Sequence, residues 1–364
     1  MPPLLKQIRL QGFRAFRYLT LAPLTRINLL VGANNTGKTS VLEGAEILLG
    51  GGAPHFLARS LRRRMESVPG RGDRLPEPDV RHLFFGHALV HGASFRLEGV
   101  NSASSFVECA LVAPMRHPTL FETAFEPDAA EVESGLTLRI KTDDPDVSAK
   151  IPLSSLGGLP AEYQRRSSSA LTDYASGPVT YLGTEDSTPM RLSFLWDRIV
   201  LTPEEPKVIE ALQVLEPGIE RIAATSRESS GSEGGILVKL KESDERLPLG
   251  SLGDGIRRLL LLSVSIATSG GGYLLVDEVD TGLHYSVMVD MWRLLIESAR
   301  RLNVQVFATT HSLDCVRALS CLFEREPDIQ DDVSVHRIVR GASQAVMYSA
   351  EEIHAAAQQH IEVR

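Results

Sequence analysis

The chain has 364 residues, of which 43% are hydrophobic, 23% are charged and 6% are aromatic. This length and balance predict a globular protein with one large core or about two domains. The formal net charge of −8 argues against a protein that coats nucleic acid over its whole surface, although it is compatible with a local basic patch.

The cysteines and the apolar segments indicate the compartment. Cys109, Cys315 and Cys321 form no CxxC pair, so neither a zinc knuckle nor a disulfide framework is predicted. The N-terminal residues lack the pattern of a signal peptide, and the longest apolar run is shorter than the roughly 20 residues that span a bilayer. We therefore expect a cytoplasmic protein without a membrane partner.

The N-terminal segment contains a strand, a loop and a helix in succession. Residues 6–13 alternate apolar and polar side chains, as a half-buried strand does. Two more strand-like pieces lie in residues 18–31, on either side of Pro23, and the second ends at a glycine-rich loop. Residues 39–49 have helical spacing, and the glycines at 50–52 stop the helix.

The middle of the chain changes character twice. Residues 53–80 are rich in Arg, Pro and Gly, which predicts a short helix followed by an exposed loop. Short strand signals between about residues 93 and 142 predict an antiparallel β lobe. Residues 161–224 are predicted to be helical, and one helix begins with Thr202 as N-cap and continues through residue 222.

Helices and buried strands alternate in the last part of the chain. This alternation is typical of a mostly parallel sheet that helices cover on both faces. The final helix begins with a capping box. The predicted strands are residues 235–241, 273–278 and 304–312, and the predicted helices are residues 256–269, 284–302 and 349–363.

The glycine-rich loop matches the pattern GxxxxGK[ST] at every fixed position. Its glycines let the backbone curl so that N–H groups point at phosphate oxygens, and the following helix offers its N-terminus to the negative charge. Lys38 is expected to reach the β- and γ-phosphates of ATP, and the Thr39 hydroxyl to bind Mg²⁺. The predicted ATP-binding residues are Gly32, Asn34, Asn35, Thr36, Gly37, Lys38, Thr39 and Ser40.

Two acids follow the apolar strand at residues 273–276. A P-loop needs a second magnesium ligand at the end of a neighbouring strand, and Asp277 is expected to hold Mg²⁺ through water. Glu278 is then placed to orient or deprotonate the attacking water, which predicts hydrolysis and not a kinase reaction. The alternative is a strand that simply ends in solvated acids, and the P-loop makes this alternative weak.

Two further motifs come from the same part of the chain. In "LGSLGDGIRR", Ser251 and Gly253 stand at the start of a helix, where an anion can bind. The other interpretation of this motif is an N-capped structural helix. His311 follows the apolar part of its strand, residues 304–308, and the other interpretation is a histidine that only caps a strand end.

Taken in order, these motifs resemble an ABC-type ATPase of the RecF/SMC and OLD-like branch. The resemblance covers about the first 50 residues and positions 235–320. It implies an α/β P-loop NTPase with an ABC-ATPase-like head, in which helices cover a mixed or parallel central sheet, plus an antiparallel β lobe and a helical insertion. It also implies an ATPase core made of residues 1–52 and 235–364, with residues 53–234 inserted.

The resemblance assigns roles to several residues. In that family the S-x-G signature completes the ATP site of a second protomer, a role that falls to Ser251 and Gly253. The sequence "SLGDG" departs from the usual LSGGQ but keeps its Ser and second Gly. Asp280 resembles the D-loop that couples the two sites, and His311 resembles the switch histidine that senses the γ-phosphate. The Q-loop glutamine of the family has no counterpart that we can place.

The partners follow from the same resemblance. Too few residues follow His311 for the Toprim nuclease domain of OLD proteins, and no coiled coil like that of SMC proteins is visible. We therefore expect a stand-alone ATPase that forms an ATP-dependent homodimer or higher oligomer and regulates a separate effector, such as a nuclease in bacterial antiphage defence. The alternative is a RecF-like DNA-repair ATPase that binds duplex DNA through Arg59, Arg62, Arg63 and Arg64. The other interpretation, which the sequence favours, is a solvated helix face or a contact to an acidic partner.

Overall fold

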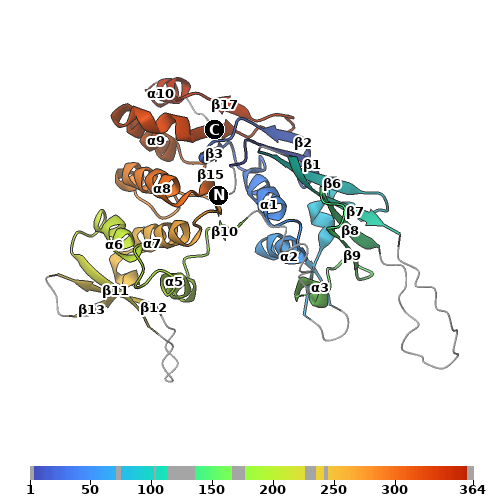
Figure 1. The fold of residues 1–364 in the computed structure, drawn as a ribbon, viewed down its shortest axis with the longest axis horizontal. Coiled ribbons are helices and arrows are strands. Elements are labelled where there is room, and N and C mark those ends of the chain that lie inside the picture. The colour runs from blue at the N-terminus through green and yellow to red at the C-terminus, as the bar shows by residue number, and fades with distance from the viewer. Residues whose placement is uncertain are drawn as a thin grey trace.

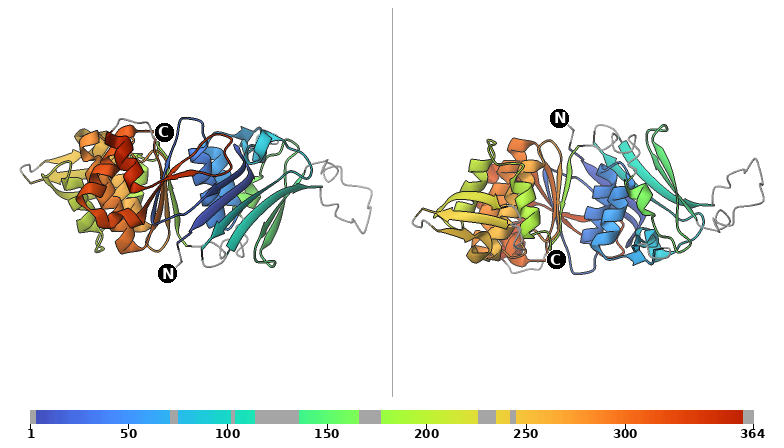
Figure 2. Two further views of the ribbon diagram at one scale, coloured as in Figure 1. Left: turned by 90° about the horizontal axis from the view of Figure 1, so that it is seen from above. Right: turned by 90° about the horizontal axis from the view of Figure 1, so that it is seen from below.

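The computed structural model describes residues 4–70, 75–101, 104–113, 136–165, 177–225, 235–241 and 245–358. The molecule is built in layers, which Figures 1 and 2 show from three sides. A layer of helices covers one face of a mostly parallel sheet, helices α1 and α2 cover the other face, and an antiparallel sheet lies beyond them.

The parallel sheet brings distant parts of the chain together. Its strands lie in the order β10–β14–β15–β3–β16–β17, and only the pairing of β16 with β17 is antiparallel. The ends of β3, β14 and β15 therefore meet at one edge of the sheet. The strands are β3 (Ile27–Val31), β10 (Val179–Leu182), β14 (Tyr273–Val276), β15 (Gln305–Thr309), β16 (Val333–Arg337) and β17 (Val346–Tyr348).

Both faces of this sheet are buried, which explains its uninterrupted apolar strands. In β14, Leu274 and Val276 belong to the core beneath the helical layer, whereas Tyr273 and Leu275 belong to the core around α1. The two cores are therefore separated by the sheet itself.

The antiparallel sheet has the strand order β2–β1–β6–β7–β8–β9. Its buried side chains, such as Leu10 and Leu97, pack in one core with Val41 and Ala45 of α1. Helix α1 is consequently enclosed between the two large sheets, with nearly all of its residues buried. The strands are β1 (Gln7–Phe13), β2 (Phe16–Leu21), β6 (Ser94–Val100), β7 (Ser104–Val112), β8 (Thr137–Thr142) and β9 (Ser148–Pro152).

The remaining elements complete the layers. A small sheet of β11 (Ile219–Thr225), β12 (Gly235–Leu240) and β13 (Arg246–Pro248) packs beside α5 and α6, and β4 (Ser67–Val68) pairs with β5 (Glu77–Pro78). The described helices are α1 (Lys38–Leu49), α2 (Pro54–Arg63), α3 (Ala161–Arg165), α5 (Pro189–Trp196), α6 (Glu205–Gln213), α7 (Asp254–Thr268), α8 (Met288–Leu302), α9 (Leu313–Arg325) and α10 (Ala350–Gln358).

Several predictions of local structure are confirmed. The strand, loop and helix of the N-terminal segment, the antiparallel lobe and the alternating helices and strands of the C-terminal part are all present. The capping box of α10 also forms, because the Glu352 N–H donates to Ser349 Oγ and the Ser349 N–H donates to Glu352 Oε2.

The prediction of a helical segment over residues 161–224 was wrong in two places. Residues 179–182 form β10, and residues 219–225 form β11. Helix α6 begins at Glu205, and Thr202 does not cap it but accepts a hydrogen bond from the Glu204 N–H. Strand pairing between distant segments decided the structure here, and local helical spacing does not report such pairing.

The sheets do not follow the expected division of the chain. Strands β1 and β2, expected in the ATPase core, belong to the antiparallel sheet with the inserted lobe. Strand β10, expected in the insertion, pairs in parallel with β14 of the core sheet. The N-terminal segment and residues 53–234 are therefore interleaved, and the antiparallel lobe shares its core with the P-loop helix.

Candidate nucleotide-hydrolysis site

The P-loop connects β3 to α1 through a tight curl. Gly32 and Gly37 have φ angles of 145° and 104°, and Asn35 lies in the left-handed region at 62°. A Cβ atom on Gly32 would lie 2.7 Å from the Ile338 carbonyl oxygen, and one on Gly37 would lie 2.4 Å from the Phe16 ring. Only glycine fits at these two positions, so the loop and its neighbours are packed as one unit.

Lys38 lies across this loop. Its ammonium group donates hydrogen bonds to the carbonyl oxygens of Gly32, at 2.7 Å, and Ala33, at 3.0 Å. Burial lowers the pKa of Lys38, and the nearby carboxylates of Asp277 and Glu278 oppose that shift. The side chain is thus held with its charge beside the P-loop and facing two acids from a distant part of the chain.

Asp277 lies directly opposite the start of α1. The Thr39 hydroxyl lies 3.0 and 3.2 Å from the two Asp277 carboxylate oxygens, and the Thr309 hydroxyl donates to Oδ1 at 2.6 Å. Hydroxyl and carboxylate oxygens are the hard donors that Mg²⁺ prefers. The donors of Thr39 and Asp277 therefore fit a magnesium ion that also binds phosphate.

Glu278 is held in an unusual conformation. Its φ angle of 48° is rare for a residue with a side chain, and its N–H donates to Thr309 Oγ1 at 2.8 Å. Thr281 Oγ1 donates to one carboxylate oxygen at 3.1 Å, and His311 Nδ1 lies 3.4 Å from the other. The carboxylate remains 39% exposed and His311 44% exposed, so both groups are accessible at the mouth of the site.

Arg258 joins the helix after the signature motif to the two acids. It is only 2% exposed, and its guanidinium donates to the carbonyl oxygens of Gly183, Asp277 and Glu278 at 2.7–3.1 Å. Burial lowers the pKa of Arg258, while neighbouring acids oppose the shift. The motifs give Arg258 no role, because its partners are backbone groups of other segments.

The expected site residues divide into two groups. Residues 34–40, Asp277 and Glu278 line one cavity of about 440 Å³, and His311 contacts Glu278 at its mouth. Asp280 is buried beside it and accepts a hydrogen bond of 2.6 Å from Thr310 Oγ1. Ser251 and Gly253 are not among the described residues that line this cavity.

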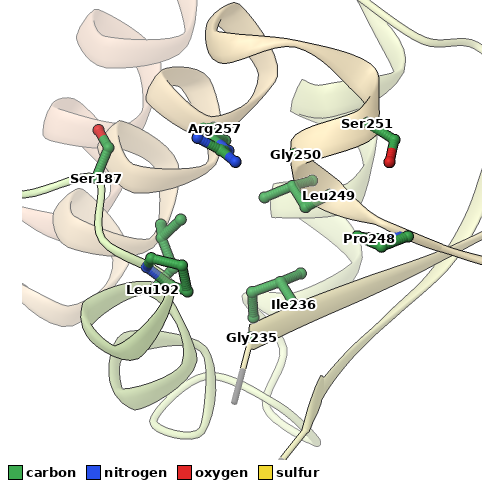
Figure 3. Close-up of a pocket in the computed structure, with 10 residues that line it drawn as sticks. Ser187, Leu192, Gly235, Ile236, Pro248, Leu249, Gly250, Ser251 and Arg257 are labelled. Atoms are coloured by element: carbon green, nitrogen blue, oxygen red, sulfur yellow. The ribbon is translucent and has the colours of Figure 1, made fainter. Parts of the chain in front are cut away.

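The signature motif lies elsewhere on the surface. Ser251 belongs to a 3₁₀ turn (Leu249–Leu252), and Gly253 directly precedes α7. Both residues are exposed. Figure 3 shows the turn beside a second pocket between α5, β12 and α7, into which Leu192, Ile236 and Leu249 project. Within one chain, the signature motif and the P-loop are therefore on different surfaces.

Several residues that the motifs did not indicate border the P-loop cavity. The buried Arg14 forms an ion pair with Glu43 of α1, with 2.7 Å between Nε and Oε2, and the Arg64 Nε lies 2.8 Å from the other oxygen of Glu43. Only the tertiary structure reveals this network, because its members have no fixed spacing. The cavity residues that sequence reasoning missed are Arg14, Arg64, Glu66, His87 and Thr309.

The arginine cluster proposed as a DNA-binding patch is largely committed to other contacts. Arg63 pairs with Glu46, and Arg64 pairs with Glu43, both on α1. Arg62 donates to the Gln164 side chain. Carboxylates of the same chain therefore neutralise two of these four arginines, whereas Arg59 and Arg62 have no carboxylate within ion-pair distance among the described residues.

Comparison with known proteins identifies the family. A family profile described as "AAA domain, putative AbiEii toxin, Type IV TA system" matches residues 126–315, slightly more than half of the chain. The chain belongs to this AAA family. A second AAA-domain profile matches residues 7–82, which contain the P-loop.

Relatives of this AAA protein agree with that assignment. An "ATP/GTP phosphatase" of Helicobacter pylori is 20% identical over 347 residues, which are 89% of this chain and 90% of the relative. An uncharacterised protein of Methanocaldococcus jannaschii is 34% identical over 65 residues, 18% of this chain and 57% of that protein. Together with the AAA domains, the phosphatase relative establishes the chain as a nucleotide-binding ATPase.

The fold also matches a solved structure. An SMC head bound to the C-winged helix domain of ScpA aligns with a TM-score of 0.52 at 16% identity, over 96% of this chain and 99% of that chain. The predicted RecF/SMC-type α/β head is thereby confirmed as the fold. In the described part of the chain, no helix has the length and apolarity that crossing a membrane requires.

Proposed function

We propose that this AAA protein is an ATP-driven switch in which two copies close over two Mg-ATP molecules and open after hydrolysis. In this proposal Lys38 binds the phosphates, Thr39 and Asp277 hold Mg²⁺, and Glu278 activates water. Ser251 and Gly253 of one copy complete the site of the other. When bound, Mg²⁺ would neutralise part of the negative charge of the phosphates.

The position of the signature motif is the observation that carries the proposal. Ser251 and Gly253 are exposed on a surface separate from the P-loop cavity, at the N-terminus of the 15-residue helix α7. That helix nevertheless reaches the catalytic acids through Arg258. The phosphate bound at the start of α7 would therefore belong to the ATP of a second copy. Its binding would act through Arg258 on Asp277 and Glu278 of the first copy.

The proposed chemistry uses groups whose positions are described above. Glu278 points its exposed carboxylate into the mouth of the cavity, and His311 beside it offers a hydrogen-bond donor for a γ-phosphate oxygen. Asp280 is proposed to act at the interface of the two copies, since it is hydrogen-bonded to Thr310 and lies two positions after Glu278 in the chain.

The test measures assembly in a variant that binds but does not hydrolyse ATP. Glu278→Gln keeps the shape of the side chain and removes the base, so Mg-ATP should convert it to a dimer or higher oligomer in light-scattering chromatography. Lys38→Ala in the same background should remain in the state seen without ATP. An unchanged mass of Glu278→Gln at saturating Mg-ATP would remove the closing-dimer proposal.

We also propose that the switch acts on a separate effector protein, such as a nuclease in bacterial antiphage defence. The support is the AbiEii-type description of the matching family profile. In the presence of ATP, Glu278→Gln should retain a protein encoded by a neighbouring gene on affinity purification. Lys38→Ala should not retain it. Identical co-purifying proteins for both variants would contradict the regulation of a partner by ATP.

A further inference from the structure

A third pocket, distinct from the P-loop cavity and from the pocket beside the signature turn, lies between α2 and α5. Figure 1 shows both helices on the lower side of the molecule. Helix α2 lies beside α1, and α5 lies beside the small sheet of β11, β12 and β13. The pocket has a volume of about 600 Å³, and none of its lining residues borders the P-loop cavity. Five of the residues that line it are arginines, namely Arg59, Arg62, Arg63, Arg191 and Arg198.

The positive charge of this arginine pocket is largely uncompensated. Arg63 is paired with Glu46, at 3.2 Å between Nη1 and Oε1, and stacks on the Tyr181 ring at 3.6 Å. Among the described residues, no carboxylate lies within ion-pair distance of the other four guanidinium groups. The only further acid in the lining, Asp186, accepts a hydrogen bond from the Gly183 N–H. Although the chain has a net charge of −8, these four arginines lie together without a carboxylate in ion-pair contact in the part of the chain that the structure describes.

Two side chains of α5 add information about the ligand. The Nε of Arg191 is buried without a hydrogen-bond partner among the described residues, which is costly for a charged group unless something binds there. Phe194 is 58% exposed and lies on the same helix, which also packs Leu192 and Trp196 into the core. An exposed aromatic ring beside guanidinium groups offers both a stacking surface and phosphate contacts.

We propose that this arginine pocket binds a nucleoside phosphate, with the phosphate held by Arg191, Arg198 and the arginines of α2 and the base stacked on Phe194. Arginine recognises phosphate with two parallel hydrogen bonds, and base stacking on an aromatic ring works with any base. The ligand is either a free nucleotide or the terminal nucleotide of a single strand, which share this chemistry.

The pocket is connected to the P-loop helix. Glu46, the partner of Arg63, is a residue of α1 and is 1% exposed, and burial raises its pKa. A phosphate that draws Arg63 away leaves this carboxylate buried without its partner. Strand β10, which contributes Val179 and Tyr181 to the lining, is hydrogen-bonded to β14, the strand that ends at Asp277. Ligand binding would therefore alter the elements that hold both halves of the hydrolysis site.

The experiment measures binding of three probes at low salt, namely adenosine monophosphate, a 5′-phosphorylated dinucleotide and a single-stranded oligonucleotide. The double variant Arg191→Ala/Arg198→Ala should lose roughly tenfold or more in affinity, and Phe194→Ala roughly fivefold or more. The control Arg340→Ala changes an exposed arginine outside the pocket and should bind as the unchanged protein does. Thermal melting checks that each variant is folded.

The outcomes distinguish a free nucleotide from a strand end, and binding at the arginine pocket from binding at the P-loop. Tighter binding of the oligonucleotide with a steeper salt dependence identifies a strand end, and equal binding of all probes identifies a free nucleotide. Lys38→Ala should leave binding intact, because the P-loop is a different site. The proposal is overturned if no probe binds, if Lys38→Ala abolishes binding, or if Arg340→Ala weakens it as much as the α5 variants do. Since binding and not hydrolysis is measured, failure here leaves the proposed dimer switch untouched.

Discussion

The P-loop cavity and the signature turn differ in how completely one chain builds them. Around the P-loop, Lys38, Thr39, Asp277 and Glu278 are each held by hydrogen bonds within the chain. At the signature turn, Ser251 and Gly253 are exposed at the start of a helix and face no acid or phosphate-binding group of their own chain's P-loop cavity. In the proposed switch, this difference separates a preorganised catalytic half from a recognition half that a second copy would complete.

The largest effect should come from the preorganised half. Glu278→Gln removes the proposed base, and we expect phosphate release to fall by roughly 10²–10⁴-fold, since this is the usual contribution of a general base. Steady-state ATPase assays measure the loss. Glu297→Gln, an exposed glutamate on α8, is the matched control and should keep full activity. Normal hydrolysis by Glu278→Gln would mean that another group activates water.

The next effect tests whether the signature turn acts across two chains. Ser251→Arg places a bulky cation at the proposed interface, and we expect about a 10²-fold loss of ATPase activity, similar to the loss of one transition-state donor. Mixing Ser251→Arg with the inactive Lys38→Ala should restore part of the activity. In a mixed dimer, one site combines the intact P-loop of Ser251→Arg with the intact signature turn of Lys38→Ala. Two inactive proteins that stay inactive when mixed would argue that the turn acts only within its own chain.

A smaller effect concerns the link between the two regions. Arg258→Met leaves three partly buried carbonyl groups without their donor, and we expect the free energy of unfolding to fall by about 2–4 kcal/mol. Urea denaturation followed by circular dichroism gives this value. Arg257→Met, at the partly exposed neighbouring position, should change the free energy of unfolding much less. Equal losses for the two variants would show that the Arg258 hydrogen bonds contribute little.

The smallest effect concerns the sheet beneath the P-loop. Burial lowers the pKa of His336 to about 4, while an unfolded histidine titrates near 6.5. Between these values the unfolded chain binds more protons, so this residue alone should lower the free energy of unfolding by about 2 kcal/mol from pH 7 to pH 5. His336→Gln should flatten that dependence, whereas the exposed His91→Gln should not. Parallel pH profiles for His336→Gln and the unchanged protein would contradict the buried neutral imidazole.

The sequence was informative where chemistry depends on short motifs. The GxxxxGK[ST] loop and the Asp-Glu pair after an apolar strand are local patterns, and parallel pairing brings their strand ends to one edge. Strand β10 was missed because its four residues become a strand only by pairing with β14, far along the chain. For β11, Pro217 and Gly218 were a turn signal that the helical interpretation overlooked.

The arginines show the same limit more sharply. Helical spacing grouped Arg59, Arg62, Arg63 and Arg64 correctly on α2, but spacing says nothing about which carboxylates face them. Glu43 and Glu46 neutralise two of the four, while Arg191 of α5 and Arg198, just after α5, join the arginine pocket from much later in the chain. Charge complementarity between distant helices is a tertiary property, so no window of sequence contains it.

Helix α1 has a mechanical consequence for any nucleotide-driven motion. Its buried Glu43 and Glu46 are fixed by Arg14, Arg63 and Arg64, which belong to the β1–β2 connection and to the end of α2. Tilting α1 alone would separate the buried carboxylates of Glu43 and Glu46 from their arginine partners, at a cost of several kcal/mol. We therefore expect a nucleotide-driven displacement of the P-loop helix to move the antiparallel sheet together with it, because Arg14, Arg63 and Arg64 tie the two to each other.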